Sequence, residues 1–165
     1  MITAIVIPVD PAQSLHRKQI SPSDIDAYRA VVDGPLQLVA FDRPPAALYI
    51  NEEGKVDGLN INARATVLTW VHNSNLRGHD VIVGDALLVG PPDSTGHDRS
   101  VPEEYLRLLL NPGSFAVEVQ VHGDERWYGN EQVFGDVFAA YAAGIDLAQR
   151  WTHVVDVRVV PAKVG

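Results

Sequence analysis

One segment in the first half of the chain limits the fold most, because strand, turn and helix signals follow one another within it. Residues 47–51 are apolar and suit a strand, residues 52–55 form an acidic turn, and residues 63–70 have helical spacing. Asn60 or Asn62 stands where this helix needs an N-cap. The segment therefore predicts strands and helices within one domain.

Capping residues and apolar spacing predict the remaining elements. We expect helices at residues 22–33, 63–72, 102–110 and 136–149, and strands of one sheet at residues 115–122 and 154–160. Further strands are expected at residues 2–9, 36–41, 81–90 and 126–134, and a hairpin with arms at residues 48–51 and 55–58. Ser21 is the expected cap of the first helix, and Gly54 the expected left-handed residue of the hairpin turn.

These elements predict an α+β fold in two parts. The first part is a mixed, largely antiparallel sheet with three helices, and the second is a C-terminal β-β-α-β unit. The helix-ending run of Asn111, Pro112 and Gly113 separates the two. We therefore expect an α+β domain at residues 1–111 and a small unit at residues 112–165, packed on that domain or on a second subunit.

Composition and charge exclude several classes of protein. The chain has 165 residues, 46% of them hydrophobic and 21% charged, as in a folded globular protein. Its formal net charge of −8 repels phosphate backbones and argues against nucleic-acid binding. It has no cysteine, which excludes disulfides, thiolate metal sites and a cysteine nucleophile. No apolar run reaches the ~18 residues of a membrane span, so we expect a cytoplasmic protein that is not embedded in a membrane.

Four stretches together resemble a family of small domains of unknown function that contain an Asn-Glu-Glu-Gly motif. They are Ile-Val-Ile-Pro at residues 5–8, Ala-Leu-Tyr-Ile-Asn-Glu-Glu-Gly-Lys at 47–55, Asn-Ala-Arg-Ala-Thr at 62–66 and Asp-Val-Ile-Val-Gly-Asp-Ala-Leu-Leu-Val-Gly at 80–90. The resemblance covers residues 1 to 110 and implies a setting in actinobacterial phages, plasmids and their hosts. It implies no particular chemistry.

The acidic turn is the first candidate site. Its carboxylates and the nearby carboxamides could surround one polar pocket for a basic or hydrogen-bonding ligand. The predicted ligand-binding residues are Asn51, Glu52, Glu53, Asn60 and Asn62. The structural alternative is a solvated hairpin turn in which the two glutamates have no further role. Acid–base work by paired carboxylates would require burial that separates their pKa values.

Trp127 and Tyr128 are the second candidate site, because an exposed aromatic strand commonly anchors protein contacts. Packing of both rings beneath the last helix is the structural alternative.

Catalytic and metal signatures are absent from the sequence. No serine lies in a Gly-x-Ser-x-Gly elbow, no glycine-rich phosphate loop occurs, and His72 and His79 are seven residues apart, unlike helical metal pairs. We therefore predict no catalytic residue, no metal and no cofactor.

Three functional hypotheses follow. The first is a non-catalytic accessory protein of phage or mobile-element origin that binds another protein, such as a host or defence component. The second is a protein that binds a small ligand or nucleotide derivative near Glu52, Glu53, Asn60 and Asn62, with hydrolysis as a further option. The third is a structural homodimer built on edge strands.

Overall fold

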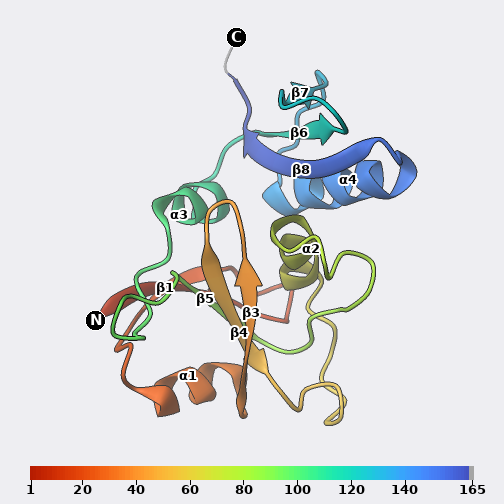
Figure 1. Ribbon diagram of the computed structural model, residues 1–165. Helices are drawn as coiled ribbons and strands as arrows, with labels where there is room; N and C mark the ends of the chain where they lie inside the picture. Colours follow the sequence, from red (N-terminus) through yellow and green to blue (C-terminus); the bar gives the residue numbers. More distant parts are fainter. Residues whose placement is uncertain (164–165) are drawn as a thin grey trace. The chain divides into compact units, whose positions relative to one another are not determined.

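The computed structural model describes residues 1–163, which form two compact units (Figure 1). The first unit contains Met1–Thr66 and Asp80–Leu110, and the second contains Val67–His79 and the described residues from Asn111 onward. The α+β class is confirmed, and the described residues contain four helices. All strand pairings in the two sheets of residues 1–163 are antiparallel, so the mixed sheet predicted from the sequence is wrong.

The first unit is built on a five-stranded sheet. Its elements are β1 (Ile2–Ile7), β2 (His16–Ile20), α1 (Ile25–Val32), β3 (Leu36–Phe41), β4 (Ala46–Asn51), β5 (Ala86–Val89) and α3 (Glu103–Leu110). The strand order is β2-β1-β5-β4-β3. All four residues of β5 are fully buried, which fits a strand in the middle of the sheet with both faces covered.

Helix α1 contacts β4 and β5 and covers one face of this sheet (Figure 1). Tyr28 on α1 packs into the core of that face. The buried members of this core are Ala4, Val6, Ile20, Tyr28, Ala47, Leu87 and Val89. Helix α3 packs near the turn of the β3–β4 hairpin, where the Tyr105 hydroxyl donates to the Pro44 carbonyl oxygen at 2.8 Å.

The second unit joins a three-stranded sheet to a helix. Its elements are β6 (Phe115–Val121), β7 (Tyr128–Gly129), α4 (Val137–Arg150) and β8 (Val154–Pro161), in the strand order β7-β6-β8. Helix α2 (Ala63–His72) contributes its first residues to the first unit and the rest to the second. A Cβ added to Gly144 of α4 would lie 3.4 Å from Val117, so α4 packs closely on the valine face of the sheet.

The predicted strands at residues 115–122 and 154–160 are confirmed as paired neighbours in one sheet. The strand predicted at residues 126–134 is much shorter, because only Tyr128 and Gly129 pair with β6 as a strand. Phe134 adds an isolated bridge to Phe115. The alternating valines of β6 and β8 therefore identify the strands that carry the buried face.

Other boundaries differ from the predictions for local reasons. The Asp24 side chain, rather than that of Ser21, caps α1 by accepting from the Ala27 amide at 3.1 Å. No strand was predicted between residues 11 and 20, where β2 lies, and the exposed, charged residues of β2 are typical of a protected sheet edge. The hairpin arms are β3 and β4, so the arm predicted at residues 55–58 is wrong. No helix within residues 1–163 is long and apolar enough to cross a membrane.

Candidate functional site

Asn51, the first predicted ligand-binding residue, is buried at the end of β4 and held by the chain itself. Its Nδ2 donates to the Asp33 carbonyl oxygen at 3.1 Å, and its Oδ1 accepts from the Glu53 amide at 2.8 Å. The first bond ties the end of β4 to the end of α1, and the second shapes the acidic turn. Asn51 thus has a structural role on both sides of its carboxamide.

Asn62 is fully buried and joins three segments of the first unit. Its Nδ2 donates at 2.9 Å to the carbonyl oxygens of both Ile7 and Gly84. Its Oδ1 accepts from the Ala65 amide at 3.0 Å, which confirms the predicted cap at the start of α2. Every polar atom of this carboxamide therefore has a partner within the chain.

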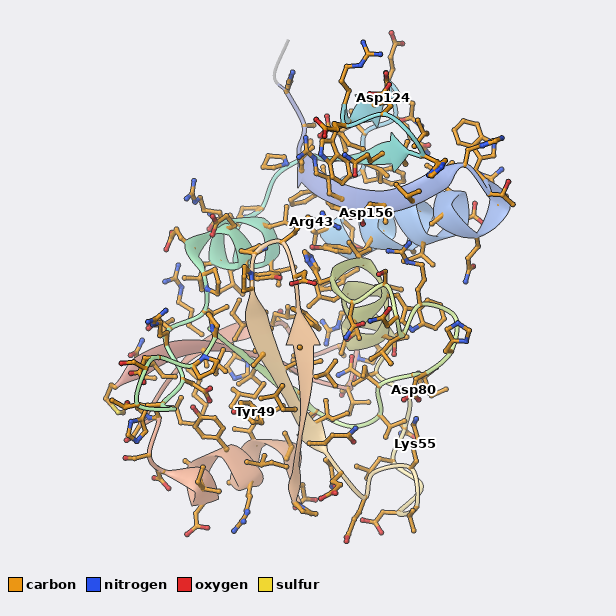
Figure 2. All side chains as sticks on the ribbon, in the orientation of Figure 1. Arg43, Tyr49, Lys55, Asp80, Asp124 and Asp156 are labelled. Carbon is orange, nitrogen blue, oxygen red and sulfur yellow. The ribbon has the colours of Figure 1, made fainter. Side chains whose placement is uncertain are left out.

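Glu52, Glu53 and Asn60 are exposed around the turn that follows β4. Lys55 and Asp80 form an ion pair beside this turn, where Figure 2 shows them adjacent. The positive φ predicted for Gly54 is wrong, because the residue with φ 72° is Gly58. Gly54 is instead buried, and an added Cβ there would meet the Val83 side chain at 2.8 Å.

The five predicted residues thus fall into two buried carboxamides with internal partners and three exposed side chains. None of the five lines either of the two cavities described below. Their role in ligand binding stays a prediction.

Trp127, in the second predicted site, lies on the face of the small sheet opposite α4. The Arg158 guanidinium stacks 4.3 Å from the centre of the Trp127 ring. Arg158 is held in turn by Glu118, with Nη2 to Oε1 at 2.7 Å and Nε to Oε1 at 2.8 Å. Because Glu118 and Arg158 pair across β6 and β8 and alternate with the buried valines, they point away from α4. We call Trp127, Arg158 and Glu118 the Trp127 face.

Tyr128 is the first residue of β7, and its side chain contacts Asp124 in the turn between β6 and β7. Figure 2 labels Asp124. The Tyr128 hydroxyl donates to the Asp124 carboxylate, which also accepts from the Arg126 side chain at 3.1 and 3.2 Å. Hydrogen bonds from Arg126 and Tyr128 hold the pKa of the Asp124 carboxyl well below its usual range. Tyr128 pairs opposite Val119 and is 40% exposed, so it lies on the other face of the sheet from Trp127.

A third cluster, which the sequence did not identify, surrounds Asp98 in the first unit. Asp98 is only 8% exposed, and its Oδ2 accepts from the Tyr28 hydroxyl at 3.0 Å. Tyr49 packs edge-on against Tyr28 with ring centres 5.1 Å apart and lies between the sheet and α1 (Figure 2). Burial, followed by the charge and hydrogen bonding of Asp98, raises the pKa of both tyrosines far above the ordinary value. Two neutral phenols therefore share one buried carboxylate.

The open cavities of the first unit include two that have charged side chains in their lining. One, of about 470 Å³, is lined by Ile2, Ser21, Pro22, Ser23, Asp93, His97, Asp98, Arg99 and Ser100. The other, of about 370 Å³, is lined by Val6, His16, Lys18, Ala27, Ala30 and Val31. The sequence signal for the first cavity was the pair of tyrosines on apolar faces, since a buried tyrosine hydroxyl requires a polar partner. Among residues 1–163, no group of three or more histidine, aspartate or glutamate side chains could hold a metal ion.

Comparison with curated proteins and with solved structures finds no match. A family model does match, and it covers residues 2–113, which include β1 to α3 and end before β6. The family is described as Domain of unknown function (DUF3846). The matched residues contain the predicted acidic turn and the Asp98 cluster, whereas Trp127 lies beyond them. Since the match spans more than half of the sequence, the chain belongs to the DUF3846 family.

Proposed function

We propose that the protein is a non-catalytic accessory protein that binds another protein through the Trp127 face. The observation that carries this proposal is the stack of Trp127 on Arg158, with Glu118 fixing the guanidinium from a neighbouring strand. Tryptophan and arginine are among the residue types that most often dominate binding energy at protein interfaces.

The stack is pre-organised, which supports binding rather than mere packing. Arg158 is held by one hydrogen bond and one ion-pair contact to the same carboxylate oxygen, and its guanidinium fixes the indole ring on which it lies. A side chain already ordered in the free protein loses less conformational entropy on binding. The adjacent turn is ordered in the same way by Asp124, so the border of the face is also fixed.

Charge defines the kind of partner. The net charge of −8 attracts a partner whose contacting surface is basic at its rim, and the attraction should weaken as salt is added. We place this interaction in the cytoplasm and assign the protein to the accessory proteins of phages or other mobile elements. A host or defence component is then the partner class. The family resemblance of residues 1 to 110 is the support for this setting.

The test compares two tryptophan variants of the same unit. Tagged wild-type protein captures its partner from a lysate of the encoding organism, and the purified partner is then titrated against each variant. Trp127→Ala should weaken binding about 30-fold or more, as expected for a central aromatic contact. Trp151→Ala is the matched control, because Trp151 is 58% exposed and lies at the end of α4.

Both variants are first checked for an unchanged melting temperature. Equal affinity of wild-type protein and Trp127→Ala would overturn the proposal, as would a partner that loses affinity only with Trp151→Ala. A failure of wild-type protein to capture any partner that can be titrated would overturn it as well.

A further inference from the structure

The 470 Å³ cavity of the first unit is lined by charged side chains of both signs. We infer that it binds a small zwitterionic ligand of the size of a free α-amino acid, with the ammonium group at Asp98 and the anionic group at Arg99. The cavity volume of about 470 Å³ lies in the range of small-molecule sites, about 300–1,000 Å³. This inference is independent of the partner surface proposed for the second unit.

Asp98 provides the anionic side of the site. It lines the cavity, is 8% exposed, and has no cationic partner among residues 1–163. A carboxylate offers about four acceptor positions, and the phenols of Tyr28 and Tyr49 account for two of them. A buried carboxylate supported by neutral donors alone is attractive to a cation, because a buried charge is costly without an opposite charge.

Arg99 provides the cationic side. Its exposed side chain lines the same cavity, and within the described residues no hydrogen bond or ion pair holds its guanidinium. Its main chain is fixed, because its amide donates to the Pro91 carbonyl oxygen at 3.2 Å and its carbonyl oxygen accepts from the Gly90 amide at 2.9 Å. A guanidinium recognises a carboxylate through two parallel hydrogen bonds.

Two serine hydroxyls add polar groups to the lining near the start of α1. The Oγ atoms of Ser21 and Ser23 lie 3.1 Å apart, and both residues line the cavity. Hydroxyls can donate to the ligand's anionic group or accept from its ammonium group. Asp93 contributes less to recognition, because its Oδ1 already accepts from the Thr95 amide and hydroxyl at 2.8 and 2.6 Å. Asp98 and Arg99 are therefore the two side chains that define the ligand class.

The experiment is a calorimetric titration of the full-length protein with the free α-amino acids. The tightest binder is then compared with the amine that lacks its carboxylate and with the acid that lacks its amino group. We expect one bound amino acid per chain, with both matched compounds binding at least tenfold more weakly. Arg99→Ala and Asp98→Asn should each weaken binding at least tenfold. Arg17→Ala is the matched control, because this exposed arginine of β2 lies outside the cavity lining.

The outcomes decide the inference in either direction. It is overturned if no amino acid binds, if either matched compound binds as tightly as the amino acid, or if Arg99→Ala binds like wild-type protein. Because Asp98 also anchors two tyrosines, each variant is checked by melting temperature. Arg99→Ala, which alters only an exposed side chain, decides the result if Asp98→Asn does not fold.

Discussion

Asn62 shows how much of the first unit can depend on a single side chain. It caps α2 and also satisfies carbonyl oxygens of Ile7 and Gly84, which belong to segments far apart in the sequence. Removing the carboxamide leaves these buried groups without partners and removes the cap. We therefore expect Asn62→Ala to lower the free energy of unfolding by about 3 kcal/mol, measured by denaturant unfolding.

Asn60 provides the matched control for this prediction. It lies two residues away and is exposed, and the cap is formed by the Asn62 side chain instead. Asn60→Ala should change the free energy of unfolding by no more than about 0.5 kcal/mol. If both substitutions lowered the free energy of unfolding equally, the hydrogen bonds of the Asn62 carboxamide would not have the structural role assigned to them.

At the scale of elements, Tyr28 of α1 and Tyr49 of β4 connect the helix and the sheet to the Asp98 loop. Burial raises the pKa of both phenols above the ordinary value of 10.0, so the folded state favours their neutral forms. Their contribution to stability is complete below pH 10 or so and is lost as the pH rises above that value towards the folded-state pKa. The melting temperature should therefore fall as the pH is raised through this range.

The measurement is the melting temperature of wild-type protein and of the Tyr28→Phe/Tyr49→Phe double variant on the alkaline side. Without the two phenols, the double variant should show a weaker pH dependence, even if its melting temperature is lower throughout. Tyr128→Phe serves as a control, because Tyr128 is exposed in the second unit. The same alkaline decline in wild-type protein and double variant would contradict the account of this cluster.

The elements differ in how well the sequence predicted them. Alternating valines predicted β6 and β8, because one face of each strand is buried against α4 and leaves a clear period of two. Strand β2 was missed because it lies at a sheet edge, where pairing to β1 stabilises it without an apolar pattern. The hairpin arm predicted at residues 55–58 was wrong because it assumed a positive φ at Gly54. The glycine there instead leaves room for the Val83 side chain, which an added Cβ would meet at 2.8 Å.

The candidate sites differ for a related reason. The cap by Asn62 is a local pattern, and the sequence predicted it together with Asn60 as the alternative. The Asp98 cluster joins residues about 70 positions apart, so no local pattern identifies which acid the buried Tyr28 contacts. The stack of Trp127 on Arg158 depends on strand register in the same way, because the two residues meet only when β6 pairs with both of its neighbours.

At the scale of the whole molecule, the two units divide the proposed roles. The DUF3846 match covers residues 2–113 and contains the cavity with Asp98 and Arg99. The Trp127 face lies beyond the match, on the sheet of β6, β7 and β8. The two proposed interactions therefore involve separate sets of residues, one in the family domain and one on the C-terminal sheet.

The most direct test of partner binding through the Trp127 face is amide hydrogen exchange of the protein, free and in complex with its captured partner. The reporting amides lie in the β6–β7 turn and in β7, within residues 122–130, where the two-residue strand β7 offers little protection of its own. We predict that the partner slows exchange in this segment and leaves residues 91–100 unchanged. Unchanged exchange at residues 122–130, with protection found only in the first unit, would contradict the account.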